Sequence, residues 1–264
     1  MIPDYHIHTI LCKHAKGDIG DYRKVACEKS FSEICFTDHA PNPDEYDSKH
    51  RMGLAQFPEY KKMVLSLSED KPPVVLFGVE ADYYENCTCF LEDWLAEQPL
   101  DLVIGSVHYI ENWGFDNPNE RSVWDSVDVT NTWRIYFQLV ERLADTRLFD
   151  VAGHLDLPKK FGYRPSDKDL KEIVQPVLDR IAIAKMAVEL NTSGLRKPVN
   201  EIYPSAMLLS LAYEREIPIC FGSDAHLPGE VGYRFEEALN LAKDVGYTHA
   251  VRFSGRHQIS YPLP

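Results

Sequence analysis

Short apolar runs alternate with longer amphipathic stretches along the chain. The apolar runs predict strands over residues 2–7, 33–38, 73–80, 100–108, 148–154, 186–193, 217–224 and 248–254. The stretches between them predict helices over residues 20–30, 59–70, 129–145, 169–185, 204–216 and 234–246. Strands that alternate with helices indicate βα units and a mainly parallel sheet. Seven or eight such units in a chain of 264 residues favour a closed or nearly closed barrel over a doubly wound sheet.

The series of strands and helices runs on without an obvious division. No stretch rich in proline, glycine or serine separates one part from another, and no internal repeat is visible. A single α/β barrel of this length is ordinary, and such a chain can bury a large core. We therefore expect residues 1–264 to form one domain. Irregular loops over 41–58 and 111–128 follow strand ends, where folds of this kind keep their binding loops.

The chain is acidic, with 41 Asp and Glu against 28 Lys and Arg and a formal net charge of −13. A surface of this sign repels a phosphate backbone, which argues against a nucleic-acid partner. It does not exclude a small phosphorylated substrate, because metal ions or a local basic cluster can reverse the field inside one pocket.

Nothing in the sequence predicts a membrane or secretory segment. No apolar run approaches the roughly 18 residues that a membrane span needs, and MIPDYH lacks the features of a signal peptide. We expect a cytoplasmic protein with no membrane partner. The six cysteines are then expected to be free thiols, with Cys35 and Cys220 buried in apolar strands. Cys87 and Cys89 are spaced too closely for a zinc knuckle.

Residues that can bind metal recur where the predicted strands end. Because parallel strands place their C-terminal ends on one rim, these side chains are expected to meet there. The set is His6, His8, Asp38, His39, Glu80, His108, His154, Asp224 and His226, with His14 in the loop after the first strand. A single histidine at a strand end is more often structural, but chance does not readily place such residues at almost every strand end. The remaining histidines are expected to be structural or exposed: His50, His249 and His257.

The chemistry of these side chains indicates a site with more than one metal ion. His6 and His8 lie two residues apart on a strand, so both imidazoles point to the same face. Imidazole and carboxylate together suit zinc, manganese or iron. There are more candidate ligands than one metal ion can bind while keeping a coordination position open for substrate or water. We therefore expect two or three divalent ions, with a carboxylate that bridges two of them.

The segments that carry these residues resemble the motifs of a known family. DYHIHT, FTDHA, GVEADYY, GSVHYI, AGHLDL and GSDAH resemble, in this order, those of the PHP (polymerase and histidinol phosphatase) superfamily. The resemblance covers nearly the whole chain. It implies an α/β fold, a distorted (β/α)7 barrel of PHP type, with the metal site at the C-terminal rim of the strands.

The resemblance also implies how the ligands are divided. The three sets are His6, His8, Glu80 and Asp224; Glu80, His108 and His154; and His14, His39 and His226. Glu80 would bridge the first two metals. Asp38 is expected to orient a neighbouring histidine rather than to bind metal.

Four further segments, RMGLAQFPEY, HYIENWGFDNP, HLDLPKKFG and NTSGLRKPVNEIYPS, resemble the monofunctional histidinol-phosphate phosphatases of this superfamily. The implied reaction is hydrolysis of L-histidinol phosphate to L-histidinol and phosphate in histidine biosynthesis, by attack of a metal-bound hydroxide. One alternative is a PHP phosphoesterase that acts on nucleotides or short nucleic acids, and the acidic charge argues against it. Another is a non-enzymatic domain that binds metal for stability, and the filled ligand positions argue against it.

Three of the ligands are also expected to be catalytic. Glu80 would hold two metals together, and Asp224 and His226 are candidate donors of a proton to the leaving alkoxide. A metal-bound water is an equal candidate for that proton.

Other side chains are candidates for substrate binding. Arg196 and Lys159 follow strand ends, at positions where the phosphatase family keeps basic phosphate contacts. Tyr83 and Trp113 lie in aromatic and acidic segments that could receive the ammonium and imidazole of the substrate. The expected partners are a small phosphorylated substrate and a second copy of the chain in a homo-oligomer, and the expected metal is zinc, manganese or iron.

Overall fold

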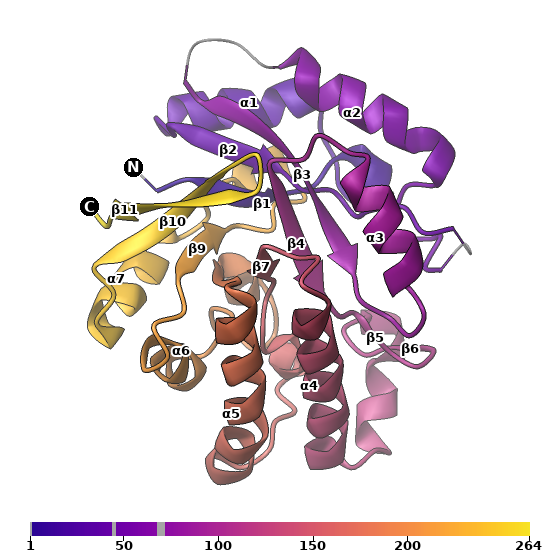
Figure 1. Cartoon of the computed structure of the whole chain (residues 1–264), viewed down its shortest axis with the longest axis vertical. Coiled ribbons are helices and arrows are strands. Elements are labelled where there is room, and N and C mark those ends of the chain that lie inside the picture. The colour runs from indigo at the N-terminus through magenta and orange to yellow at the C-terminus, as the bar shows by residue number, and fades with distance from the viewer. Residues whose placement is uncertain (1, 44–45, 68–71) are drawn as a thin grey trace.

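Seven parallel strands form the central sheet of the computed structural model, which describes residues 2–43, 46–67 and 72–264 (Figure 1). In sheet order they are β1 (Asp4–Ile7), β2 (Glu33–Phe36), β3 (Val74–Asp82), β4 (Leu102–Ser106), β7 (Val151–Ala152), β8 (Ala187–Asn191) and β9 (Ile219–Gly222). Each strand pairs in parallel with the next. The expected distorted (β/α)7 barrel is therefore confirmed.

The sheet closes on itself between its first strand and the segment that follows its last. The amide of His8 donates to the carbonyl of Ala225 at 3.0 Å, and the amide of Ala225 donates to the carbonyl of His6 at 3.1 Å. Further along the same seam, the carboxylate of Asp4 accepts a hydrogen bond from the amide of Ser223 at 2.9 Å. The two ends of the strand series thus meet at the rim where the candidate ligands lie.

Helices surround this barrel on its outer side (Figure 1). They are α1 (Ile19–Glu28), α2 (Phe57–Ser66), α3 (Thr88–Ala96), α4 (Val129–Thr146), α5 (Asp167–Ala184), α6 (Ala206–Tyr213) and α7 (Phe235–Val245). The six predicted helices are confirmed, although residues 68–70 of the second lie outside the described residues. α3 was not predicted. Several helices begin at a side chain that caps the first turn, such as Asp18, whose carboxylate accepts from the amide of Gly20 at 2.8 Å.

The predicted strand over 248–254 forms, but it does not join the barrel. β10 (His249–Ser254) pairs antiparallel with β11 (His257–Pro262) as a separate hairpin. Val251 and Phe253 of this hairpin pack against the inward side chains at the N-terminal ends of the barrel strands, among them Tyr5. The rings of Tyr5 and Phe253 meet edge to face with centroids 5.4 Å apart. These apolar side chains fill one end of the barrel interior, the apolar floor of the barrel, and the polar side chains of the interior lie at the opposite end, at the C-terminal rim of the strands.

A β-bulge in β1 lets this short strand contribute side chains both to the apolar end of the barrel and to the metal cluster at the other end. Asp4 pairs with Ile34 and Ile7 pairs with Phe36, so three steps along β1 match two along β2. A bulge of this kind re-aims the side chains around it. As a result Tyr5 belongs to the apolar floor while its neighbour His6 faces the carboxylate of Glu80.

All six cysteines are free thiols, and Cys35 and Cys220 are buried in the barrel floor, as the sequence predicts. In the described part of the chain, no helix has the length and apolar character that crossing a membrane requires.

Candidate metal centre

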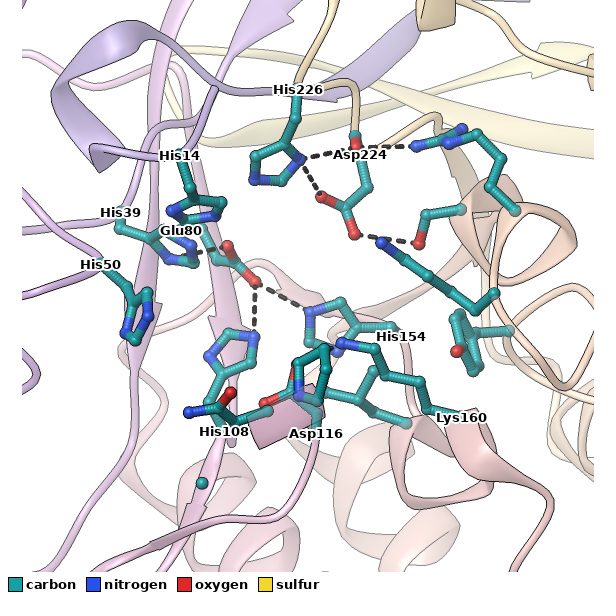
Figure 2. Close-up of a pocket in the computed structure, with 18 of the residues that line it drawn as sticks. His14, His39, His50, Glu80, His108, Asp116, His154, Lys160, Asp224 and His226 are labelled. Atoms are coloured by element: carbon teal, nitrogen blue, oxygen red, sulfur yellow. Dashed lines mark hydrogen bonds and ion pairs between the residues drawn. The ribbon is translucent and has the colours of Figure 1, made fainter. Parts of the chain in front are cut away.

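Glu80 lies near the end of β3 at the middle of the candidate site, and its two oxygens face different imidazoles (Figure 2). Oε2 lies 3.3 Å from Nε2 of His6 and 3.0 Å from Nδ1 of His39. Oε1 lies 2.9 Å from Nε2 of His154 and 3.6 Å from Nε2 of His108. One buried carboxylate therefore stands between two groups of histidines, an arrangement that suits a bridging ligand.

Asp224 reaches the same cluster from the turn after β9. It has a left-handed backbone conformation, with φ of 52°, which is uncommon outside glycine but is tolerated by aspartate. Its Oδ1 lies 3.3 Å from Nε2 of His8 and 3.4 Å from Nδ1 of His226. Its Oδ2 accepts a hydrogen bond from Oγ of Ser193 at 3.0 Å. The sharp turn thus presents one carboxylate oxygen to the histidines and anchors the other.

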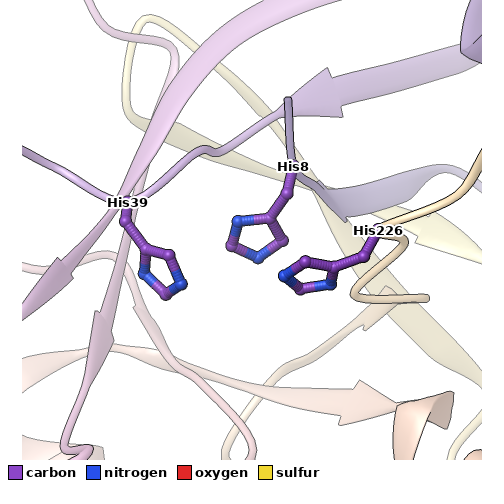
Figure 3. A group of neighbouring side chains, drawn as sticks. All are labelled: His8, His39 and His226. Carbon is purple, nitrogen blue, oxygen red and sulfur yellow. The ribbon is translucent and has the colours of Figure 1, made fainter. Parts of the chain in front are cut away.

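His14, His39 and His226 lie on the same side of the cavity (Figure 2), and His8 lies between His39 and His226 (Figure 3). The rings of His14 and His226 stack with centroids 4.5 Å apart, and those of His14 and His39 are 5.8 Å apart. His8 lies 4.1 Å from the ring of His226 and 4.6 Å from that of His39. The loop histidine His14 thus belongs to the same cluster as the strand-end histidines. All nine candidate ligands converge at this rim.

Several ring nitrogens in the cluster are buried without a hydrogen bond. Among the described residues this holds for Nε2 of His6, His8 and His226. Buried polar atoms are nearly always paired, so each such nitrogen needs an explanation. Carboxylate oxygens lie 3.3 to 4.0 Å from the first two of these nitrogens, a separation that a shared cation would explain. The residues therefore fit divalent metals of the kind that imidazole and carboxylate bind.

The carboxylates of the cluster are strongly stabilised as anions. Burial raises the pKa of Glu80, but the imidazoles of His6, His39 and His108 outweigh it, so this pKa lies well below its usual range. The pKa of Asp224 is likewise well below normal, because the neighbouring histidines outweigh burial. Both side chains are consequently available as anionic ligands at neutral pH.

The histidines divide into two groups by protonation. For His8 and His108, burial lowers the pKa, but nearby carboxylates outweigh it and raise the pKa to about 9 and about 10. Burial and the imidazoles of His39 and His8 lower the pKa of His14 to about 4. The pKa of His226 is also well below normal, first because of burial and then because of His8. Metal must therefore displace protons from the first group.

Glu189 is an important residue that the sequence analysis did not single out. It projects from β8, where its Oε1 lies 2.7 Å from Nδ1 of His6 and its Oε2 accepts from the amide of His154 at 2.9 Å. A carboxylate on Nδ1 fixes the ring and leaves Nε2 for a metal. The sequence did contain a signal for it: a glutamate within the apolar predicted strand 186–193 needs a buried partner.

Asp38 lies behind the cluster, where an orienting residue is expected. Its Oδ1 is 3.5 Å from Nδ1 of His8 and accepts from the amide of His39 at 2.8 Å. Its Oδ2 accepts from the amide of Thr9 at 3.1 Å. These contacts position the backbone and side chain of two candidate ligands.

A cavity of about 380 Å³ opens over the cluster, and three cations line it: Lys160, Arg196 and Lys197. Arg196 donates to the carbonyls of Ser223 at 2.9 Å and Asp224 at 3.0 Å, while its buried Nη1 makes no hydrogen bond to a described residue. Burial, followed by repulsion from Lys160, lowers the pKa of Lys197. Carboxylates line the same cavity, and Lys160 pairs with Asp116 at 2.9 Å and Arg196 with Glu230 at 3.2 Å. Bound metal ions would add the positive charge that an anion site needs.

The structure does not bring every substrate-binding candidate to this cavity. Lys159 is buried, donates to the carbonyl of Ile202 at 2.7 Å and lies 2.9 Å from Asp156, so its neighbour Lys160 faces the cavity instead. Tyr83 and Trp113 are also absent from the described residues that line the cavity. The described residues of the loops 41–58 and 111–128 that line the cavity are Asp47, His50, Gly114, Asp116, Asn117 and Pro118, and Tyr109 lies just before the second loop. The side chain of His50 is 42% exposed, which agrees with the expectation that it is structural or exposed, and it also lies at the cavity wall.

Comparisons with known proteins agree with this architecture. Residues 4–193 match the PHP domain family, and residues 207–236 match the PHP-associated family. A Deinococcus radiodurans protein named "Probable histidinol-phosphatase" is 44% identical over 92% of this chain and 93% of its own length. The "Histidinol-phosphatase" of Bacillus subtilis is 31% identical over 89% of this chain and 97% of its own length.

Two solved structures share the fold. One, from Listeria monocytogenes, has a TM-score of 0.81 at 24% identity and covers 89% of this chain and 99% of that chain. The other is the histidinol phosphate phosphatase of Lactococcus lactis in complex with zinc, L-histidinol and phosphate. Its TM-score is 0.78 at 22% identity, and the match covers 98% of both chains.

Proposed function

The chain belongs to the PHP domain family, and we propose that it is a metal-dependent phosphatase that hydrolyses L-histidinol phosphate to L-histidinol and phosphate. The observation that carries this proposal is the 44% identity with the Deinococcus radiodurans relative over almost the whole of both chains. The cavity adds chemical support, because a cluster suited to metals and a group of three cations line the same space.

We propose that the nine clustered side chains hold two or three divalent ions. His6, His8, Glu80 and Asp224 would hold the first, Glu80, His108 and His154 the second, and His14, His39 and His226 the third. The two-sided contacts of Glu80 support its role as the bridge. Zinc, manganese and iron all suit these ligands, and the Lactococcus lactis protein was solved in complex with zinc. Bound ions would polarise the phosphate and make a nucleophile available from water at neutral pH.

The cations of the cavity would bind and orient the phosphate. We propose Arg196 for this role, because its unbonded Nη1 and planar guanidinium suit a phosphate oxygen. Lys160 and Lys197 line the same cavity and would add to the binding. Lys159, by contrast, is better suited to holding the local backbone.

The protonation states of Asp224 and His226 favour one of their two expected roles. Asp224 is ionised and His226 is neutral at pH 7, because each has a pKa well below its usual value. These are the states in which each side chain can donate a lone pair to a cation. We therefore propose that both act in catalysis as ligands rather than as donors of a proton to the leaving alkoxide.

The domain organisation, cellular location and partners of the protein follow from the same reasoning. We propose that residues 1–264 act as one domain, that the protein works in the cytoplasm in histidine biosynthesis, and that nucleic acid is not its partner. The net charge of −13 supports the last point. A homo-oligomer is compatible with all of these statements.

The direct test is a substrate panel. Purified protein supplied with zinc or manganese is expected to release phosphate from L-histidinol phosphate far faster than from sugar phosphates or nucleotides. Comparable rates on unrelated sugar phosphates would refute the substrate assignment. Activity on a bis-phosphorylated nucleotide but not on L-histidinol phosphate would instead favour a nucleotide phosphoesterase. An Asp224→Ala variant that stays folded should lose the activity.

A further inference from the structure

A buried arginine, Arg51, lies behind the metal cluster in the segment between β2 and α2. Only 2% of this residue is exposed, and an arginine is rarely so buried without charged partners. Its Nη2 lies 2.7 Å from Oδ2 of Asp82 and 3.2 Å from Oδ2 of Asp47. Its Nη1 donates to the carbonyl of Ala40 at 3.2 Å, next to the candidate ligand His39. One guanidinium therefore joins two carboxylates and the segment that follows β2.

The first carboxylate leads to the metal cluster. Asp82 is the last residue of β3, and its Oδ1 lies 2.8 Å from Nδ1 of His108. Nε2 of the same imidazole lies 3.6 Å from Glu80. A carboxylate on Nδ1 selects the tautomer in which Nε2 offers its lone pair. Arg51 holds that carboxylate in place from behind.

The second carboxylate leads to the cavity wall. Oδ1 of Asp47 accepts a hydrogen bond from the hydroxyl of Tyr109 at 2.7 Å and lies 2.6 Å from Nδ1 of His50. Tyr109 and His50 both line the cavity above the cluster. Because Oδ2 of Asp47 is held by Arg51, the same guanidinium also fixes this part of the wall.

We propose that Arg51 is a positioning residue that acts on both the metal ligand His108 and the wall formed by Tyr109 and His50. The part that concerns substrate rests on the proposed function. The part that concerns metal rests on the contacts of Arg51, Asp82 and His108 alone. A residue that only stabilised the fold would not link two functional surfaces through two separate carboxylates.

The test measures zinc affinity by competition with a chromophoric chelator, alongside kcat and KM for L-histidinol phosphate. Arg51→Met is expected to lower zinc affinity by about 10- to 100-fold, the range found when an orienting contact behind a metal ligand is lost. Asp82→Asn should lower zinc affinity in the same direction. Asp47→Asn should raise KM and leave zinc affinity near that of the wild type. Arg51→Lys should restore part of the zinc affinity, since it keeps the charge with a shorter reach.

Arg256 provides a matched control at the barrel floor. It forms an arginine–aspartate pair with Asp150 at 2.9 Å and donates to the carbonyl of Leu148, far from the rim. Arg256→Met should reduce stability without changing zinc affinity or KM. If Arg51→Met does not fold, the double variant Arg51→Met/Asp82→Asn carries the test, because it leaves no unpaired carboxylate of Asp82. Its zinc affinity should equal that of Asp82→Asn, since Arg51 acts through Asp82, and a further loss of about tenfold or more would overturn that route.

The outcomes separate the two proposals. Zinc affinity within about twofold of the wild type in a folded Arg51→Met or double variant would overturn the role towards His108, given the size of effect expected. An unchanged KM in Asp47→Asn would overturn the role towards the wall. A loss of zinc affinity in Arg256→Met equal to that in Arg51→Met would reduce Arg51 to a structural residue. A wild-type protein inactive on L-histidinol phosphate would refute the proposed function, while the zinc affinities would still decide the role of Arg51.

Discussion

Glu189 holds His6 from the side opposite Glu80. Its Oε1 lies 2.7 Å from Nδ1 of His6, whereas Glu80 lies 3.3 Å from Nε2 of the same ring, and all three side chains are buried. When a carboxylate binds Nδ1 of an imidazole in this way, Nε2 points in a fixed direction and its lone pair is available to a metal. Glu189→Gln keeps the size but loses the charge, so we expect zinc affinity to fall by about tenfold. Glu141→Gln, on α4 where the carboxylate pairs with Arg180 of α5 at 3.4 Å, is the control that should leave it unchanged.

Gly222 provides a second way to disturb the same contact. A Cβ at this position would lie 1.9 Å from Oε1 of Glu189 and 2.7 Å from Cβ of His6. Gly222→Ala must therefore displace one of them, and we expect a loss of about 1–3 kcal/mol in the free energy of unfolding, typical of an overpacked core. Zinc affinity should fall with it. Gly229→Ala, where nothing lies within 4 Å of the added carbon, should change neither quantity in urea titration and chelator competition.

Uptake of zinc by the metal-free protein should release protons. The pKa values of about 9 for His8 and about 10 for His108 are raised, so both imidazoles carry a proton at pH 7 and must lose it to bind metal. We expect a release of about two protons per chain at pH 7 from these two histidines, falling as the pH rises through these two values. His6 should add a third, because Glu189 and Glu80 outweigh burial and hold its pKa well above the usual range. Titration with a pH indicator in weak buffer measures the release. A value near zero at pH 7 would contradict the charged state of the two histidines.

The adjacent lysines Lys159 and Lys160 should respond in opposite ways. Lys160→Met removes a cavity cation and should raise KM for the phosphate ester. It should lower the free energy of unfolding less than Lys159→Met does, because its partner Asp116 is 24% exposed and water can solvate the carboxylate that is left. Lys159→Met leaves the buried Asp156 without its cation and should cost about 3–5 kcal/mol of stability. Steady-state kinetics and urea unfolding of the two variants distinguish these effects. A rise in KM for Lys159→Met alone would restore the assignment made from the sequence.

The barrel was predictable because its signal is periodic and repeated. Alternating apolar and amphipathic runs recur along the chain, and metal-capable residues such as Glu80 and Asp224 stand at the ends of those runs. The hairpin β10–β11 was harder to place, because a short apolar strand looks the same whether it joins a sheet or packs across its end. Nothing local in the sequence indicated that Val251 and Phe253 would complete the barrel floor.

Details of the site depended on directions that sequence spacing does not encode. Lys159 and Lys160 are neighbours in a short 3-10 helix (Leu157–Phe161), and only the packed structure decides which of them points into the cavity. Arg51 lies in an irregular loop whose path no periodicity describes. Its partners Asp47 and Asp82 are 35 residues apart in the sequence, and tertiary packing alone brings them to one guanidinium.

The seam where β1 meets the segment after β9 gives the metal ions a mechanical role. His8 stands on one side of this seam and Asp224 on the other, about 200 residues later in the chain. An ion bound by both residues cross-links two segments that are far apart in the sequence. Closing a loop of this length in the unfolded chain costs about 5 kcal/mol of entropy. Chelation should therefore loosen the barrel first along this line, with amide protons such as those of His8 and Ala225 exchanging before those of the central strands.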